Sequence, residues 1–140
     1  MKNVIRAVIL IGLTTLLSGC VEKKVDTDLL DTPDKKALYE LMVARCEALN
    51  KAELRLFEDI YVHDSPELGW ISNTGIPMWR QNGMRYNVQS LKKLSIINDD
   101  AAGRFVLVGY NRNGTRFVKS VEALFIKQGG RWRIEATGER

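Results

Sequence analysis

The hydrophobic pattern in the last third of the chain predicts three β-strands. Residues 104–111 (RFVLVGYN) are rich in β-branched and aromatic side chains, and the pair 113–114 (NG) behind them favours a tight hairpin turn. Residues 115–127 (TRFVKSVEALFIK) follow and end before a second turn signal at 129–130 (GG). Residues 131–136 then alternate polar and apolar side chains, which is typical of a strand with one buried face. The pattern predicts an antiparallel meander that other elements must cover.

Upstream of the meander, the hydrophobic spacing predicts two helices. Thr32 can cap the first helix and Pro33 suits its first position, and apolar side chains recur at helical spacing over residues 33–49. Asn50 and Glu53 resemble a second helix cap with its reciprocal partner. The short connection predicts a pair of antiparallel helices on one face of the sheet.

The pattern between these helices and the meander is more mixed. A short strand is predicted to start at residues 61–63 (YVH), with residues 69–72 (GWIS) as a partner strand and residues 78–85 as a short helix. Residues 86–98 (YNVQSLKKLSIIN) return to a strand pattern. Their alternation slips by one position, which predicts a β-bulge around residues 92–93.

The N-terminus has the features of a targeting segment. Lys2 and Arg6 precede an apolar run, residues 7–16, that is too short to span a bilayer as a mature helix. The run ends in Leu-Ser-Gly followed by Cys20, and this tetrapeptide resembles the lipobox of bacterial lipoproteins. The resemblance implies that acyl chains such as palmitate are attached to Cys20 and that the peptide is cut before it. The alternative is an ordinary secretory signal peptide that contains a cysteine.

The lipobox resemblance defines the expected organisation and location of the chain. Residues 1–19 would be the signal peptide, residues 20–32 a lipidated N-terminus and charged tether, and residues 33–140 one domain. The anchored protein would lie in the bacterial cell envelope, and Val21 favours the periplasmic face of the outer membrane over the inner membrane. Acylation would leave Cys46 without a disulfide partner, and its helical apolar setting predicts a buried small hydrophobe rather than a reactive thiol.

Charge and composition exclude two classes of partner. Removing Lys2 and Arg6 with the signal peptide lowers the 21 basic residues to 19, against 17 acidic residues, so the mature chain carries a formal charge of +2. That balance, without any block of basic residues, argues against a nucleic-acid partner. A single histidine and one remaining thiol at unrelated spacings argue against a metal site, and no cofactor is expected.

The predicted order of elements resembles the nuclear transport factor 2 superfamily, also called cystatin-like, which includes ketosteroid isomerases and polyketide cyclases. The resemblance spans residues 34–138 and rests on residues 48–50 (ALN), 56–57 (LF), 75–76 (GI) and 130–134 (GRWRI). It implies an α+β fold in which a two-helix hairpin and a short helix pack on a curved antiparallel sheet, forming a cone. It further implies a pocket at the wide end and frequent homodimers through the outer sheet face. It says little about function, because one fold hosts many activities.

The residues offer three weak catalytic candidates: Glu122, His63 and Asp64. His63 and Asp64 are neighbours, and neighbours in a strand point to opposite faces, so they cannot form a dyad without a bend. Glu122 shares a strand face with Val118 and Leu124, which places it on a pocket wall or on the outer sheet face. Walled in by apolar groups, its pKa would rise as that of a general base or acid does.

The aromatic residues are the candidates for ligand binding, because small-molecule pockets are mostly apolar. They are Trp79, Tyr110, Trp70 and Tyr86. The sequence therefore predicts a lipid-anchored envelope protein whose domain binds a small hydrophobic ligand or a protein partner without catalysis. The alternatives are a small dehydratase or isomerase that uses a pocket carboxylate, and a structural accessory subunit of an envelope complex.

Overall fold

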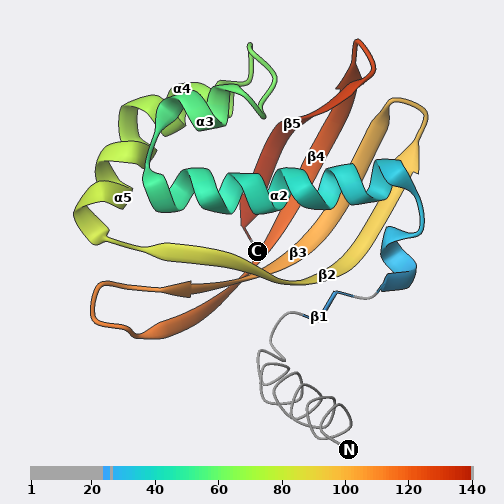
Figure 1. Cartoon of the computed structure of the whole chain (residues 1–140). Helices are drawn as coiled ribbons and strands as arrows, with labels where there is room; N and C mark the ends of the chain where they lie inside the picture. Colours follow the sequence, from blue (N-terminus) through green and yellow to red (C-terminus); the bar gives the residue numbers. More distant parts are fainter. Residues whose placement is uncertain (1–23, 26, 140) are drawn as a thin grey trace, which may run out of the picture.

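A computed structural model describes residues 24–25 and 27–139. The chain forms an α+β structure in which helices lie against one face of a curved sheet, as the sequence predicted (Figure 1). The order of strands in the sheet is β1-β2-β3-β4-β5. The strands are β1 Lys24–Val25, β2 Arg85–Ile97, β3 Asp100–Tyr110, β4 Arg116–Gln128 and β5 Arg131–Glu139. The helical elements are η2 Thr27–Leu30, α2 Pro33–Lys51, α3 Leu54–Glu58, α4 Pro66–Trp70, η3 Ile71–Gly75 and α5 Ile76–Asn82.

Helix α2 crosses the concave face of the sheet and begins as its sequence predicts. The hydroxyl of Thr32 accepts a hydrogen bond from the Lys35 amide at 3.2 Å, and Pro33 occupies the first turn. The helix ends at Ala52, whose left-handed backbone (φ 50°) lets its amide bond the Leu49 carbonyl. Its buried face consists of Leu38, Met42, Cys46, Ala48 and Leu49.

The predicted cap at Asn50 is wrong. Asn50 lies in the last turn of α2, and α3 starts at Leu54 without a side-chain cap at Glu53. The Asn50 amide instead pairs with the backbone of β2: its Nδ2 donates to the Tyr86 carbonyl at 2.9 Å, and its Oδ1 accepts from the Tyr86 amide at 2.6 Å. Asn50 thus takes the place of a neighbouring strand along the edge of the sheet.

Replacing Asn50 by alanine is expected to lower the free energy of unfolding by about 2 kcal/mol, because two backbone groups of β2 lose their partner. Urea titration followed by circular dichroism measures the change. Asn82→Ala is the matched control. Among the described residues the Asn82 side-chain amide donates only to the Met84 sulfur, at 3.9 Å, so this variant should change stability by less than about 0.5 kcal/mol. Equal losses in the two variants would contradict the role given to Asn50.

The predicted hairpin between residues 61 and 72 is also wrong. Tyr61 forms only an isolated parallel bridge with Ile134, and residues 66–82 are helical throughout. Pro66 occupies the first turn of α4, and a π-helical turn, η3, joins α4 to α5 without a break. Short apolar runs such as residues 69–72 fit a strand or a helix equally, and here the tertiary packing selects the helix.

Two bulges rotate β2 as it runs along the sheet. The register with β3 shifts at Lys92, where a bulge was predicted, and also at Gln89, where none was. Each bulge adds one residue to β2 and moves the following side chains to the other face. The inward-facing positions become Tyr86, Val88, Leu91, Leu94 and Ile96.

A third bulge changes the direction of the side chains at the end of β5. The simple alternation predicted for residues 131–136 does not include this bulge. The register shifts opposite Leu124–Phe125, so Glu135 is the extra residue on β5. Before it, Ile134 points into the core, whereas after it Thr137 and Glu139 are the residues that turn inward. This bulge supplies polar side chains to the concave face of the sheet.

The turns of the meander agree in part with the predicted ones. Gly129 and Gly130 both have positive φ, at 58° and 78°, as the expected two-residue turn requires. The Asn-Gly turn is longer than expected, because Asn111 Oδ1 accepts hydrogen bonds from the amides of Asn113 and Thr115. Asn98, with φ 54°, closes the β2–β3 turn.

The segment predicted as a flexible tether is partly attached to the domain. Residues 24–25 pair in parallel with Ser90 and Leu91 of β2, and Leu29 and Leu30 pack against the core. The lipobox and Cys20 lie outside the described residues. Within the described part of the chain, no helix is both long and apolar enough to cross a membrane.

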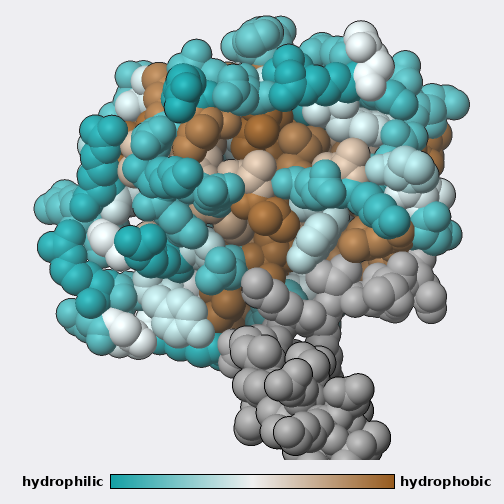
Figure 2. Space-filling view, in the orientation of Figure 1, coloured by the Kyte–Doolittle hydropathy of each residue, from teal (hydrophilic) through white to brown (hydrophobic). Residues whose placement is uncertain are grey.

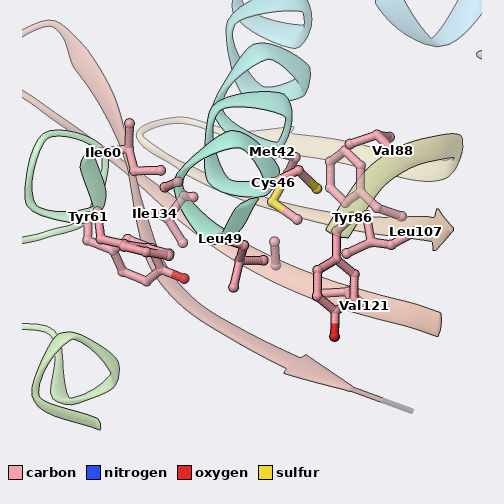
Figure 3. Close-up of a cluster of buried hydrophobic side chains, with 14 of the residues drawn as sticks. Met42, Cys46, Leu49, Ile60, Tyr61, Tyr86, Val88, Leu107, Val121 and Ile134 are labelled. Carbon is pink, nitrogen blue, oxygen red and sulfur yellow. The ribbon is translucent and has the colours of Figure 1, made fainter. Parts of the chain in front are cut away.

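The core fills the space between α2 and the sheet. Met42, Cys46 and Leu49 of α2 face strand residues such as Leu107 and Val121 (Figure 3). Hydrophobic surface is visible in the middle of the molecule, at the level of α2 and below it, within a mostly hydrophilic outline (Figure 2).

Candidate functional site

A cavity of about 510 Å³ lies between the C-terminal half of α2, the α4–η3–α5 segment and the inner face of the sheet. Its volume is within the range of small-molecule sites. Its helical wall is built from Leu49, Trp70, Ile71, Met78 and Trp79. Its sheet wall is built from Tyr86, Leu107 and Val121.

Two tryptophans close the helical side of the cavity. Trp70 and Trp79 meet edge to face with ring centroids 5.9 Å apart. Gly75 lies beneath them, because a Cβ there would come within 2.8 Å of the Trp79 ring and 3.0 Å of the Trp70 ring. The glycine and the π-helical turn that contains it allow the two rings to approach each other.

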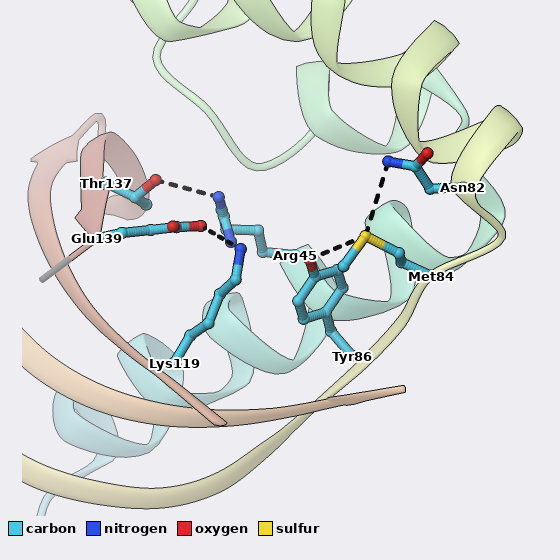
Figure 4. A network of polar contacts seen from close by, with 7 residues as sticks. All are labelled: Arg45, Asn82, Met84, Tyr86, Lys119, Thr137 and Glu139. Atoms are coloured by element: carbon cyan, nitrogen blue, oxygen red, sulfur yellow. Dashed lines mark hydrogen bonds and ion pairs between the residues drawn. The ribbon is translucent and has the colours of Figure 1, made fainter. Parts of the chain in front are cut away.

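Arg45 is the central polar residue of the cavity, reaching inward from α2 (Figure 4). Its Nε donates to the Tyr61 hydroxyl at 2.9 Å, and its Nη2 donates to Thr137 Oγ1 at 3.1 Å. The Thr137 hydroxyl and amide in turn donate to Glu67 Oε1, at 2.7 Å and 3.0 Å. The other carboxylate oxygen, Oε2, is buried without a hydrogen-bond partner among the described residues.

The protonation states of this network follow from burial and charge. Burial raises the pKa of Tyr61, and Glu67 raises it further, against the opposing effect of Arg45, so the phenol stays protonated. Burial alone would lower the pKa of Arg45, but Tyr61 and Glu67 outweigh it and the net shift is upward. Arg45 is therefore a permanent cation in a poorly hydrated setting.

A second ionic pair borders the cavity on the sheet side. Lys119 Nζ lies 2.9 Å from Glu139 Oε1 and 5.6 Å from the centroid of the Tyr86 ring (Figure 4). Burial alone would lower the pKa of Lys119, but the hydrogen bond to Glu139 and the nearby Tyr86 phenol raise it overall. Both charges of the pair are thus satisfied by each other.

Three of the four predicted aromatic residues come together in this cavity. Trp70, Trp79 and Tyr86 line it, and Trp70 remains 48% exposed. Tyr110, the fourth, is half-buried at the end of β3 and is not among the residues that line the cavity.

The three predicted catalytic candidates lie elsewhere. His63 and Asp64 are exposed in the turn after Val62, and Asp64 borders a separate, smaller hollow. Glu122 lies on the sheet face opposite to the helices, where its Oε1 is 2.9 Å from Arg104 Nη2. None of the three residues lines the cavity that contains Arg45.

No family model matches the chain, and no curated protein matches it. Its fold does match solved structures. A cystatin-like protein of unknown function from Nostoc punctiforme superposes with a TM-score of 0.65 at 16% identity, over 77% of this chain and 91% of that one. A nuclear transport factor 2-like superfamily protein from Salmonella enterica serovar Typhimurium gives 0.62 at 13% identity, over 75% and 88%. The chain has the nuclear transport factor 2-like fold.

A further match is a nuclear transport factor 2-like protein with a cystatin-like fold from Novosphingobium aromaticivorans, with a TM-score of 0.61 at 15% identity, over 76% of this chain and 80% of that one. At these identities the likeness establishes the fold alone. The chemistry of the site must therefore be read from its own residues.

The polar residues of the nuclear transport factor 2-like cavity were not predicted from the sequence. Arg45 lies in the predicted first helix between the apolar positions Met42 and Cys46, and a charge inside an apolar stripe is the one signal that marks it. Glu67 follows Pro66 in a segment predicted as a turn. Thr137 is directed inward only by the bulge in β5.

The described residues also contain no group of three or more histidine, cysteine or acidic side chains that could hold a metal ion. The site therefore offers an apolar cavity with one partly buried guanidinium, one carboxylate held by Thr137 and one ion pair.

Cys46 lies on the buried face of α2 and is expected to be unreactive. Burial raises the pKa of its thiol to about 11, so almost no thiolate is present at pH 8. In a Cys20→Ser variant, whose only thiol is Cys46, a thiol reagent should label the folded protein at least about 100 times more slowly than the protein in urea. Rapid labelling of the folded protein would show that this part of the core is open.

Proposed function

We propose that the chain is a lipid-anchored protein of the bacterial cell envelope whose domain binds a small hydrophobic ligand in the cavity without catalysis. The single observation that carries the binding function is the composition of the cavity: its walls are aromatic and aliphatic, and each charged group inside has a partner in the protein. Apolar walls with a few fixed polar groups are what ligand sites share.

The anchoring is proposed from the sequence, through acylation of Cys20 and retention at the periplasmic face of the outer membrane. The domain starts close to that residue, since the first described strand begins at Lys24. Four residues of extended chain span at most about 14 Å, so the domain would stay beside the membrane surface.

Native mass spectrometry of the full-length protein, extracted from a bacterial host without refolding, tests both parts. We expect the mass of acyl chains on the protein and an additional, dissociable small molecule. Met78→Trp, which places a bulky ring at the cavity wall from a half-exposed position, should remove the dissociable molecule. Val43→Trp, at a similarly exposed position on α2 outside the cavity, is the control and should retain it.

A bare protein mass for wild type would overturn the binding function. An unmodified Cys20 would overturn the anchoring independently, because the two masses are read separately.

The alternative of a small dehydratase or isomerase is favoured by one observation, the carboxylate of Glu67 in the cavity. Two hydrogen bonds from Thr137 hold this carboxylate in place, which suits a structural role better than proton transfer. Glu67→Gln separates the two functions: it would abolish an acid–base activity and leave binding of the dissociable molecule intact.

The second alternative, a structural accessory subunit or a homodimer through the sheet face, is favoured by exposed apolar side chains on that face. Val118 and Leu124 of β4 are 51% and 49% exposed. Light scattering distinguishes this arrangement, since Leu124→Lys would convert a dimer into a monomer.

A further inference from the structure

We propose that the cavity selects uncharged ligands that present an oxygen acceptor, such as an ester or amide carbonyl, to the guanidinium of Arg45. This inference rests on the proposed binding function and specifies the chemical class of its ligand.

Arg45 has donor capacity that the protein does not use. A guanidinium has five N–H groups, and the structure assigns one on Nε to Tyr61 and one on Nη2 to Thr137. Among the described residues, Nη1 makes no hydrogen bond. Arg45 is only partly buried by the protein, and it lines the cavity, so its remaining donors face the space where a ligand would lie.

The other polar groups of the cavity are less able to anchor a ligand. The ammonium of Lys119 is held by Glu139 at 2.9 Å, and one oxygen of Glu67 accepts two hydrogen bonds from Thr137. The second oxygen of Glu67 is buried beneath the cavity surface. Arg45 is therefore the group from which a new hydrogen bond to a ligand costs the protein least.

The charge balance of the cavity argues for an uncharged ligand. Arg45 and Lys119 supply two positive charges, and Glu67 and Glu139 supply two negative ones, so the four residues are neutral together. Glu67 already interacts with Arg45 electrostatically. A ligand carboxylate would bring an uncompensated charge into a poorly hydrated space beside Glu67, and a ligand ammonium would do so beside Arg45. A carbonyl oxygen gains a charge-assisted hydrogen bond without that cost.

The geometry of the walls orients such a ligand. Trp70 and Trp79 lie on the helical side of the cavity, and Arg45 reaches inward from α2 toward Thr137 on the sheet. An apolar chain packed on the two indoles would thus direct its carbonyl end toward the guanidinium. Because both indoles line the cavity, tryptophan fluorescence reports its occupancy.

The test compares three probes built on the same unbranched six-carbon chain: methyl hexanoate, hexanoate and hexylamine. Each is titrated against the full-length protein in phosphatidylcholine vesicles, with protein-free vesicles to correct for partitioning. We expect methyl hexanoate to bind at least about fivefold more tightly than either charged probe. Tightest binding of hexanoate or of hexylamine would overturn the inference and leave the proposed binding function standing.

A matched pair of variants tests the role of Arg45. Arg45→Met keeps an apolar side chain of similar length and is expected to weaken methyl hexanoate binding about tenfold. Arg55→Met, at an exposed position on α3 outside the cavity, should leave it within about twofold. Equal affinities in the two variants would overturn the inference, and the ranking of the probes in wild type decides the question where Arg45→Met does not fold. If no probe binds and the native mass is bare, the proposed function itself fails.

Discussion

Replacing Phe57 by alanine is expected to lower the free energy of unfolding by about 4 kcal/mol, the largest effect of any substitution considered. Phe57 is fully buried, and its ring stacks on Trp79 at 5.6 Å and contacts Tyr61 at 6.2 Å between centroids. Removing the ring opens a void beside Trp79 and Tyr61 that rigid neighbours fill only in part. Urea titration monitored by circular dichroism and by tryptophan fluorescence measures the loss.

Phe117→Ala is the matched control for this prediction. Phe117 is a half-buried aromatic residue on β4 that packs against Tyr86 at 5.6 Å, so its truncation should cost about half as much. If Phe57→Ala lost less than Phe117→Ala, Phe57 would not be the packing centre that joins the helical segments to one another.

Arg45→Leu is expected to have the second largest effect, a loss of about 2–3 kcal/mol. The substitution removes the hydrogen bonds to Tyr61 and Thr137 and leaves Glu67 without the cation that balances it. The loss of stability is limited, because water can enter the cavity and solvate the Glu67 carboxylate. Thermal and urea unfolding of the purified protein measure the change.

Arg55→Leu serves as the control for Arg45→Leu, because the Arg55 side chain is 80% exposed and lies 4.0 Å from its nearest carboxylate. Its loss should stay below about 0.5 kcal/mol. A second variant separates charge from size: Glu67→Gln combined with Arg45→Leu should recover stability relative to Arg45→Leu alone, since the unbalanced charge is then absent. No recovery would mean that Arg45 contributes through packing and not through charge.

The fold was predictable where local signals agree with the tertiary structure. Thr32 with Pro33 marked the start of α2, Gly129 with Gly130 marked the β4–β5 turn, and the slipped alternation near Lys92 marked a bulge. In each case the residue type favours the same backbone conformation that the fold requires at that position. These signals were sufficient to identify the α+β class, the helix α2 and the antiparallel meander, but not the helical segment of residues 66–75.

The sequence signals failed where packing overrides local preference. Residues 69–72 combine β-favouring side chains with a helical environment, and Asn50 resembles a cap but binds a strand edge 36 residues away in sequence. No residue type in the sequence marks the bulge at Glu135. This bulge nevertheless directs Thr137 toward the cavity. Such features depend on contacts that are distant in sequence, which periodicity does not report.

The candidate site was predictable only in part, because some of its residues are brought together by contacts that are distant in sequence. The apolar character of its walls follows from residue type, and three of the four aromatic candidates, Trp70, Trp79 and Tyr86, line the cavity whereas Tyr110 does not. The polar residues meet only in three dimensions, since Arg45 and Thr137 are 92 residues apart. From the sequence, Glu122 was a candidate carboxylate instead. It lies on the opposite face of the sheet, where it pairs with Arg104.

The pairing of β1 with β2 has a mechanical consequence. With a lipid on Cys20, any tension between membrane and domain reaches Lys24–Val25 before the rest of the described chain. Within the described residues this two-residue strand pairs with Ser90 and Leu91 alone, and we expect it to yield under force before α2 leaves the sheet. Once detached, residues 24–32 would span at most about 30 Å when fully extended. The N-terminal segment would then be an extensible connection, short without tension and longer under tension, while the cavity beside α2 keeps its structure.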